Sequence, residues 1–116
     1  MSGLNLAASS ESGVLILEAE GRLDAQSAPG LQASVLERIE GGDTRVVLDL
    51  ERLSYISSAG LRVILVTAKK LKEADGRLIV CTLQDGVAEV FRISGFDSIV
   101  DTAESRAAAL SNLTPA

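Results

Sequence analysis

Short apolar runs alternate along the chain with longer stretches in which apolar residues recur every three or four positions. The short runs cover residues 4–6, 14–19, 45–50 and 78–82, and polar segments separate them. Each of these runs predicts a β-strand. A weaker apolar pair at residues 99–100 predicts a short edge strand. The run at 45–50 is nearly continuous, which is typical of a central strand with both faces covered.

Apolar residues at helical spacing predict four helices. The first covers about 27–40, and Pro29 sets its start because proline fits only the first turn of a helix. The second follows a loop at residues 51–57, and the third covers about 84–93. Residues 101–104, with the sequence DTAE, have the pattern of a capping box, so a final Ala-rich helix is expected to begin there.

The order of these elements predicts an α/β fold with a small mixed sheet. Residues 4–6 and 14–19 are joined by a short polar turn, so they are expected to form an antiparallel hairpin. Strands separated by a helix are expected to run parallel and to be connected by right-handed crossovers. The predicted sheet has four to five strands, with about four helices packed against it. At 116 residues, the chain is expected to form a single domain over residues 1–116.

The composition restricts the core and the compartment. Apolar residues make up 47% of the chain but aromatic residues only 3%, so Val, Leu, Ile and Ala must build the core. Cys81 is the one cysteine, which excludes a disulfide framework, and its apolar neighbours indicate a buried thiol in a reducing compartment. Residues 1–8 lack the features of a signal peptide, and no apolar run is long enough for a membrane span. A cytoplasmic protein without membrane insertion is expected.

Missing residue types exclude several classes of function. The sequence contains no histidine, so a Ser-His-Asp triad is excluded, and the commonest general base and zinc ligand are missing. The net charge of −5 argues against direct binding of nucleic acid, which requires a basic surface. Neither a glycine-rich dinucleotide fingerprint nor a phosphate-loop lysine is present. We therefore expect neither an enzyme nor a metal or cofactor site.

The most informative segment is the junction between the loop at residues 51–57 and the second helix. Ser57, Ser58, Ala59 and Gly60 place two hydroxyls and two small residues at the start of that helix. The first backbone N–H groups of a helix lack internal partners, and the positive end of the helix dipole lies there, so a phosphate is well accommodated. The alternative is a plain N-cap, in which Ser57 or Ser58 accepts a backbone N–H.

The whole chain resembles the STAS-domain family, specifically its small stand-alone anti-anti-sigma factors. In that family the corresponding junction has roughly the sequence Asp-Ser-Ser/Thr-Gly-Leu, and the serine after the aspartate is phosphorylated. Here the motif corresponds to residues 57–61, so the family's phosphoserine falls on Ser58. Further matches are the Gly-x-Leu-Asp turn at residues 21–24, Val-Leu-Asp-Leu at 47–50 and Ser-Gly-Phe at 94–96. The resemblance implies the STAS fold.

Two positions depart from the family motif. Ser57 replaces the aspartate, and Ala59 replaces the second hydroxyl residue. Serine still caps a helix, so the fold is expected to be unaffected, but a carboxylate that would assist recognition by a kinase is absent. The candidate phosphate acceptors are therefore Ser58 and, as the weaker alternative, Ser57.

The resemblance implies a partner switch. The unphosphorylated protein would bind an anti-sigma factor serine kinase, the kinase would release its sigma factor, and phosphorylation at Ser58 would end the complex. A serine phosphatase acting on the phosphorylated form would restore binding. The implied partner-binding residues are Gly21, Arg22, Asp24, Ser57, Ser58, Ala59, Gly60, Leu61 and Arg62.

Some of these assignments leave an alternative open. Arg62 pairs with the phosphate or with an acidic partner, or it is merely solvated. Asp24 contributes to partner contact or caps the first helix. The alternative function is that of a STAS signalling relay or scaffold, or of a cytoplasmic transporter subunit unconnected to a sigma factor. The oligomeric state stays open.

Overall fold

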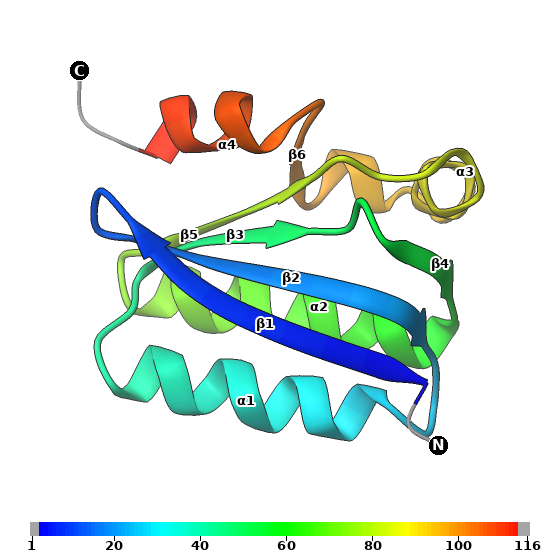
Figure 1. Ribbon diagram of the computed structural model, residues 1–116, viewed down its shortest axis with the longest axis horizontal. Helices are drawn as coiled ribbons and strands as arrows, with labels where there is room; N and C mark the ends of the chain where they lie inside the picture. Colours follow the sequence, from blue (N-terminus) through cyan, green and yellow to red (C-terminus); the bar gives the residue numbers. More distant parts are fainter. Residues whose placement is uncertain (1–2, 114–116) are drawn as a thin grey trace.

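Six strands and four α-helices follow one another in the computed structural model, which describes residues 3–113 (Figure 1). The elements are β1 (Leu4–Glu11), β2 (Val14–Leu23), α1 (Ala28–Glu40), β3 (Arg45–Asp49), β4 (Leu53–Ile56), α2 (Ser58–Glu73), β5 (Arg77–Cys81), α3 (Asp85–Ser94), the short 3₁₀ helix η1 (Phe96–Ser98), β6 (Asp101–Ala103) and α4 (Arg106–Leu113). Each predicted element has a counterpart, although several boundaries differ. Residues 1–2 and 114–116 lie outside the described part of the chain.

The sheet is mixed, as predicted. Its strand order is β1-β2-β3-β5-β6, and β4 pairs with the end of β2 on the same side as β3. β1 and β2 form the expected antiparallel hairpin, and every other pairing in this sheet is parallel. The α/β class is confirmed, and the sheet has one strand more than the largest number predicted.

The additional strand is β4, which lies in the segment that the sequence assigns to a loop at residues 51–57. That assignment is wrong for β4, because Leu53 and Ile56 are buried while the two residues between them are exposed, and so short a segment shows no alternation. β2 also continues past its predicted end at residue 19. Gly21 adopts a φ of +110° there, and the register shifts so that the end of β2 pairs with β4.

The carboxyl-terminal elements differ from the prediction in two places. The edge strand expected at residues 99–100 is instead β6, two residues later, where it pairs in parallel with β5. The capping box expected at residues 101–104 does not form, because Asp101 lies in β6. α4 begins instead after Ser105, whose Oγ accepts the N–H of Ala108 at 3.1 Å.

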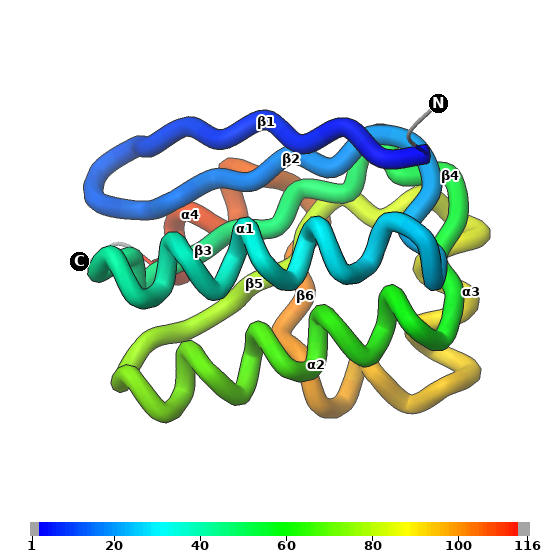
Figure 2. Tube along the Cα trace, turned by 90° about the horizontal axis from the view of Figure 1, so that it is seen from below, coloured from blue at the N-terminus to red at the C-terminus, as the bar shows by residue number. Residues whose placement is uncertain are grey.

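Helices cover both faces of the sheet (Figure 1). Figure 2 shows α1 and α2 side by side across one face, and α4 packs on the other face against β3 and β5. Alternation along β2 divides its buried residues: Leu15 and Leu17 belong to the main core, whereas Val14 and Ile16 belong to the smaller cluster under α4. Cys81 lies in the smaller cluster and is buried, which confirms the predicted buried thiol, and this burial raises the pKa of the thiol.

A buried carboxylate joins α4 to the sheet. The Asp49 side chain is 5% exposed, and Arg106 Nη2 lies 2.9 Å from its Oδ2 and 3.0 Å from Glu18 Oε1. The hydrogen bond with Asp49 is the main cause that raises the pKa of Arg106. Asp49 is therefore held in a structural ion pair, which explains why a central strand carries a charged residue.

Candidate functional site

The site begins where β4 ends and α2 starts. Ser57 has an extended backbone, and its N–H donates to the Leu23 carbonyl oxygen of β2 at 2.9 Å. Its Oγ accepts the N–H of Gly60 at 3.3 Å, so Ser57 is the N-cap of α2. Of the two serines that the sequence offers as caps, the structure selects Ser57, which is partly buried and already engaged.

Ser58 is the first residue of α2 and differs from its neighbour. It is exposed, and its hydroxyl makes no hydrogen bond with any residue between 3 and 113. The N–H groups of Ser58 and Ala59 likewise have no acceptor in this part of the chain. The first turn of α2 contains no acidic residue. A dianion on Ser58 would therefore meet free amide donors and the positive end of the helix dipole.

The end of β2 lies beside the start of α2, which brings two of the predicted segments together. β2 and β4 pair in parallel at this point. Gly21 requires its positive φ, and a Cβ here would clash with the carbonyl oxygen of Gly3. Arg22 lies over the ring of Tyr55, with its Cζ 4.2 Å from the ring centroid. The backbone of Gly21 thus places the cation of Arg22 next to the β4–α2 junction.

Asp24 forms a tight turn directly after β2. Its Oδ1 accepts the N–H groups of Gln26 and Ser27 at 3.0 and 3.1 Å, and Ser27 occupies the N-cap position of α1. Asp24 therefore orders the loop before α1 and does not cap the helix itself. The hydrogen bond from the Ser27 backbone is the main cause that holds the pKa of Asp24 below its ordinary value.

The lowered pKa of Asp24 makes the contribution of this turn to stability depend on pH. The contribution is complete above the pKa that Asp24 has in the unfolded chain. It is lost as the pH falls through the lower pKa that Asp24 has in the folded protein. Asp24→Asn keeps an acceptor oxygen but removes the charge, so we expect a lower urea midpoint at neutral pH. The difference from wild type should shrink below about pH 4, as urea titrations followed by circular dichroism would measure. A difference that is constant with pH would contradict this role of the carboxylate.

Gly60 and Leu61 lie on the buried side of the first turn of α2. A Cβ on Gly60 would lie 2.8 Å from Leu23 Cγ and 2.9 Å from Ile56 Cγ1. Leu61 is 8% exposed and packs in the main core. Both residues therefore hold α2 against the sheet in the free protein, and this leaves Ser58 facing solvent.

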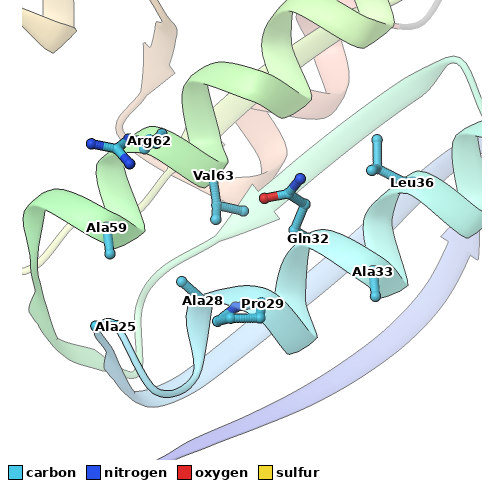
Figure 3. A pocket seen from close by; sticks show the side chains of 9 residues that line it. All are labelled: Ala25, Ala28, Pro29, Gln32, Ala33, Leu36, Ala59, Arg62 and Val63. Atoms are coloured by element: carbon cyan, nitrogen blue, oxygen red, sulfur yellow. The ribbon is translucent and has the colours of Figure 1, made fainter.

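A groove of about 490 Å³ lies between α1 and α2, next to this turn (Figure 3). Its walls are mostly small or apolar side chains, among them Ala33 and Leu36 of α1 and Ala59 and Val63 of α2. Arg62 is the one ionisable residue among the described residues that line it. The sequence did not predict the groove, because its residues come from two helices and a loop whose spacing no local pattern reveals.

The chemistry available at this site is limited. Among residues 3–113, no group of His, Cys, Asp or Glu is placed to hold a metal ion, and no helix has the length and apolar character that a bilayer span requires. In the same part of the chain no general base contacts the hydroxyl of Ser58.

Known proteins share this fold and much of this sequence. The family model described as STAS domain matches residues 5–109. BtrV of Bordetella bronchiseptica, a candidate anti-sigma factor antagonist by name, is 50% identical over 97 residues, which are 84% of each chain. The crystal structure of a candidate anti-sigma factor antagonist from Thermotoga maritima superposes with a TM-score of 0.89 at 20% identity and covers 93% of both chains. Bacillus SpoIIAA in its phosphorylated form gives a TM-score of 0.70 at 22% identity, covering 94% of this chain and 97% of that one.

The two kinds of match establish different things. The solved structures have low identity to this chain, so they establish its fold. The Bordetella relative and the domain model match most of the chain in sequence, so they establish its family. The family expected from the motif at residues 57–61 is thereby confirmed. The chain belongs to the STAS-domain family of anti-sigma factor antagonists.

Proposed function

We propose that this protein is a phosphorylation-controlled anti-sigma factor antagonist. In its unphosphorylated form it binds an anti-sigma factor serine kinase, and the kinase ends the complex by phosphorylating Ser58. A serine phosphatase then restores the binding form. The observation that carries the proposal is the exposed hydroxyl of Ser58 at the amino end of α2, free of hydrogen bonds within the described residues. As a member of its family, the chain is a regulator and not an enzyme.

A phosphate on Ser58 is compatible with the fold of the free protein. The group carries about −1.5 to −2 charges at neutral pH and has three strong acceptor oxygens. The free N–H groups of Ser58 and Ala59, and the dipole of the 16-residue helix α2, favour that charge. Bacillus SpoIIAA, which shares the fold, has been solved in its phosphorylated form.

In a closed interface the same charge opposes binding. A partner that covers Ser58 removes water from the phosphate, and an unpaired charge in an interface costs about 2–5 kcal/mol. Reversal of a two-state equilibrium from about 1:99 to 99:1 needs about 5.5 kcal/mol, so one phosphate supplies much of a switch. The proposed mechanism needs no large conformational change in this protein.

The contacts of Ser57 support Ser58 as the acceptor. The Ser57 Oγ is partly buried and accepts the N–H of Gly60, so it is less accessible to a kinase than the exposed hydroxyl of Ser58. The aspartate of the family motif is replaced here by a hydroxyl that still caps the helix. The absence of that carboxylate therefore leaves the first turn of α2, and with it the position of Ser58, intact.

The other proposed partner-binding residues fall into two groups. Arg22 and Asp24 lie on the accessible loop side of the junction, whereas Gly60 and Leu61 are buried and act by positioning the turn. The proposed interface is therefore formed by the end of β2, the loop after it and the exposed side of α2. Because the proposed partners control transcription, the proposal places the protein in the cytoplasm.

The test is phosphorylation of the purified chain by the anti-sigma factor kinases encoded in the same genome. With ATP, we expect a mass gain of one phosphoryl group that peptide sequencing confines to Ser58, together with release of the chain from the kinase. Ser58→Ala should abolish the gain, whereas Ser57→Ala, the matched control, should keep it. If none of these kinases modifies the chain, the proposal fails and a STAS relay, scaffold or transporter subunit is favoured.

A further inference from the structure

The groove between α1 and α2 begins beside Ser58. Ala59 of α2 and Ala25 of the loop before α1 face each other at one end, and Ala28 and Val63 lie next to them (Figure 3). These side chains are small and apolar, so the two helices leave a hollow of about 490 Å³ beside the serine. Such a hollow favours the burial of an apolar side chain from a partner.

Arg62 supplies the only charge among the described residues that line the groove. The side chain is exposed and makes no ion pair with any residue from 3 to 113. Although the chain as a whole has a net charge of −5, the ionisable residue at this hollow is a cation. The surface that complements it combines an apolar side chain with a carboxylate.

Arg62 also lies one helical turn after Ser58. Side chains four residues apart on a helix are neighbours, about 6 Å apart at Cβ, and they tilt towards the amino end of the helix. Figure 3 shows the guanidinium of Arg62 directed back towards the first turn of α2. A phosphate on Ser58 is within reach of this guanidinium, whose planar fork matches phosphate oxygens. The same cation is thus available to a partner's carboxylate or to the phosphate.

We propose that the groove is the second half of the partner interface and that Arg62 couples it to the switch. In the unphosphorylated protein, Arg62 binds a carboxylate of the anti-sigma factor kinase, and an apolar side chain next to that carboxylate enters the groove. Phosphate on Ser58 pairs with Arg62 and faces the carboxylate with like charge. Phosphorylation therefore removes an attraction as well as adding a repulsion. This inference rests on the proposed function and assigns the partner's chemistry and the regulation.

Titration calorimetry with the purified kinase tests the groove. Ala25→Trp fills its end next to Ala59 and should weaken binding by about tenfold or more. Two matched controls should bind within about twofold of wild type: Ala25→Ser, which keeps the hollow, and Ala107→Trp, which places the same ring on an exposed position of α4, on the opposite face of the sheet.

The role of the Arg62 charge beside the groove is tested in the same assay. Arg62→Ala should weaken binding by about tenfold, and Arg62→Lys should restore part of the loss because it returns a point charge without the planar fork. Binding of the wild-type protein should weaken as salt is raised, and binding of Arg62→Ala should depend on salt less steeply.

The coupling between Arg62 and the switch has a readout that needs no partner. In protein phosphorylated on Ser58, phosphorus NMR should give a second pKa of the phosphate that is lower in wild type than in Arg62→Ala by about 0.3 unit or more. Phosphorylation should also weaken kinase binding by a smaller factor in Arg62→Ala, because the cation that it withdraws is already missing.

Each contrary outcome has a distinct meaning. If Ala25→Trp binds like its controls while Ser58→Asp still blocks binding, the proposed function stands and the groove lies outside the interface. Equal phosphate pKa values with and without the guanidinium would disprove the coupling. A change in oligomeric state of Ala25→Trp, measured by sedimentation, would assign the groove to a second copy of the chain. If substitutions at Ser58 also leave kinase binding unchanged, the proposed function itself fails.

Discussion

Ser58→Asp should weaken binding to the anti-sigma factor kinase by about 30-fold or more, whereas Ser58→Ala should bind like wild type. The carboxylate would stand at an exposed position that the partner covers, and removing water from it in the interface costs about 2 kcal/mol or more. Alanine removes a hydroxyl that makes no hydrogen bond within residues 3–113, so it leaves the free protein unchanged. Titration calorimetry measures both affinities, and added ATP should release wild type but not Ser58→Ala.

Two controls separate the effect of charge from effects on folding. The asparagine of Ser58→Asn has nearly the size of the aspartate of Ser58→Asp but no charge. Ser58→Asn should therefore bind the kinase much more tightly than Ser58→Asp does. An acid in the first turn of a helix stabilises it by about 0.3–1 kcal/mol, so Ser58→Asp should unfold at an equal or higher urea concentration than wild type. Its loss of binding then has no explanation in loss of structure. Equal affinities for the Asp and Ala variants would rule out the switch at this serine.

The hydrophobic pattern of the sequence was sufficient to predict the strands whose residues are buried in a continuous run. The apolar runs at residues 14–19, 45–50 and 78–82 correspond to β2, β3 and β5, which lie inside the sheet. The sequence pattern missed β4 and placed β6 two residues too early, because both strands are short and pairing with a neighbouring strand decides their conformation. The pairing of β4 also depends on the positive φ of Gly21, which no periodicity reveals.

The serine motif located the candidate site, but the roles of its residues required tertiary contacts. The sequence left Ser57 and Ser58 equivalent as caps, and the structure distinguishes them: Ser57 has an extended backbone and accepts the N–H of Gly60, whereas Ser58 is the exposed first residue of α2. In the same way, Asp24 was one possible cap of α1 until the structure placed Ser27 there. The groove gave no signal, because small apolar residues of two helices form a hollow only where the helix spacing leaves one.

Gly60→Ala should lower the free energy of unfolding by about 1–2 kcal/mol, although the same change in an open helix position raises it. A Cβ would lie 2.8 Å from Leu23 Cγ, 2.9 Å from Ile56 Cγ1 and 3.0 Å from the Leu23 carbonyl oxygen. Both side chains are buried and the third atom belongs to the backbone, so none of them moves aside easily. The first turn of α2 must therefore shift away from the sheet.

Gly30→Ala is the matched control for this effect. Gly30 is the third residue of α1, as Gly60 is of α2, and a Cβ on Gly30 meets nothing within 4 Å. It should leave stability unchanged or raise it by about 0.5–1 kcal/mol, and urea unfolding compares the two variants. Because the shifted turn carries Ser58, we also expect slower phosphorylation of Ser58 in Gly60→Ala, under conditions in which this variant is fully folded. Equal stabilities would mean that α2 has room against β2 and that Gly60 does not fix the position of the serine.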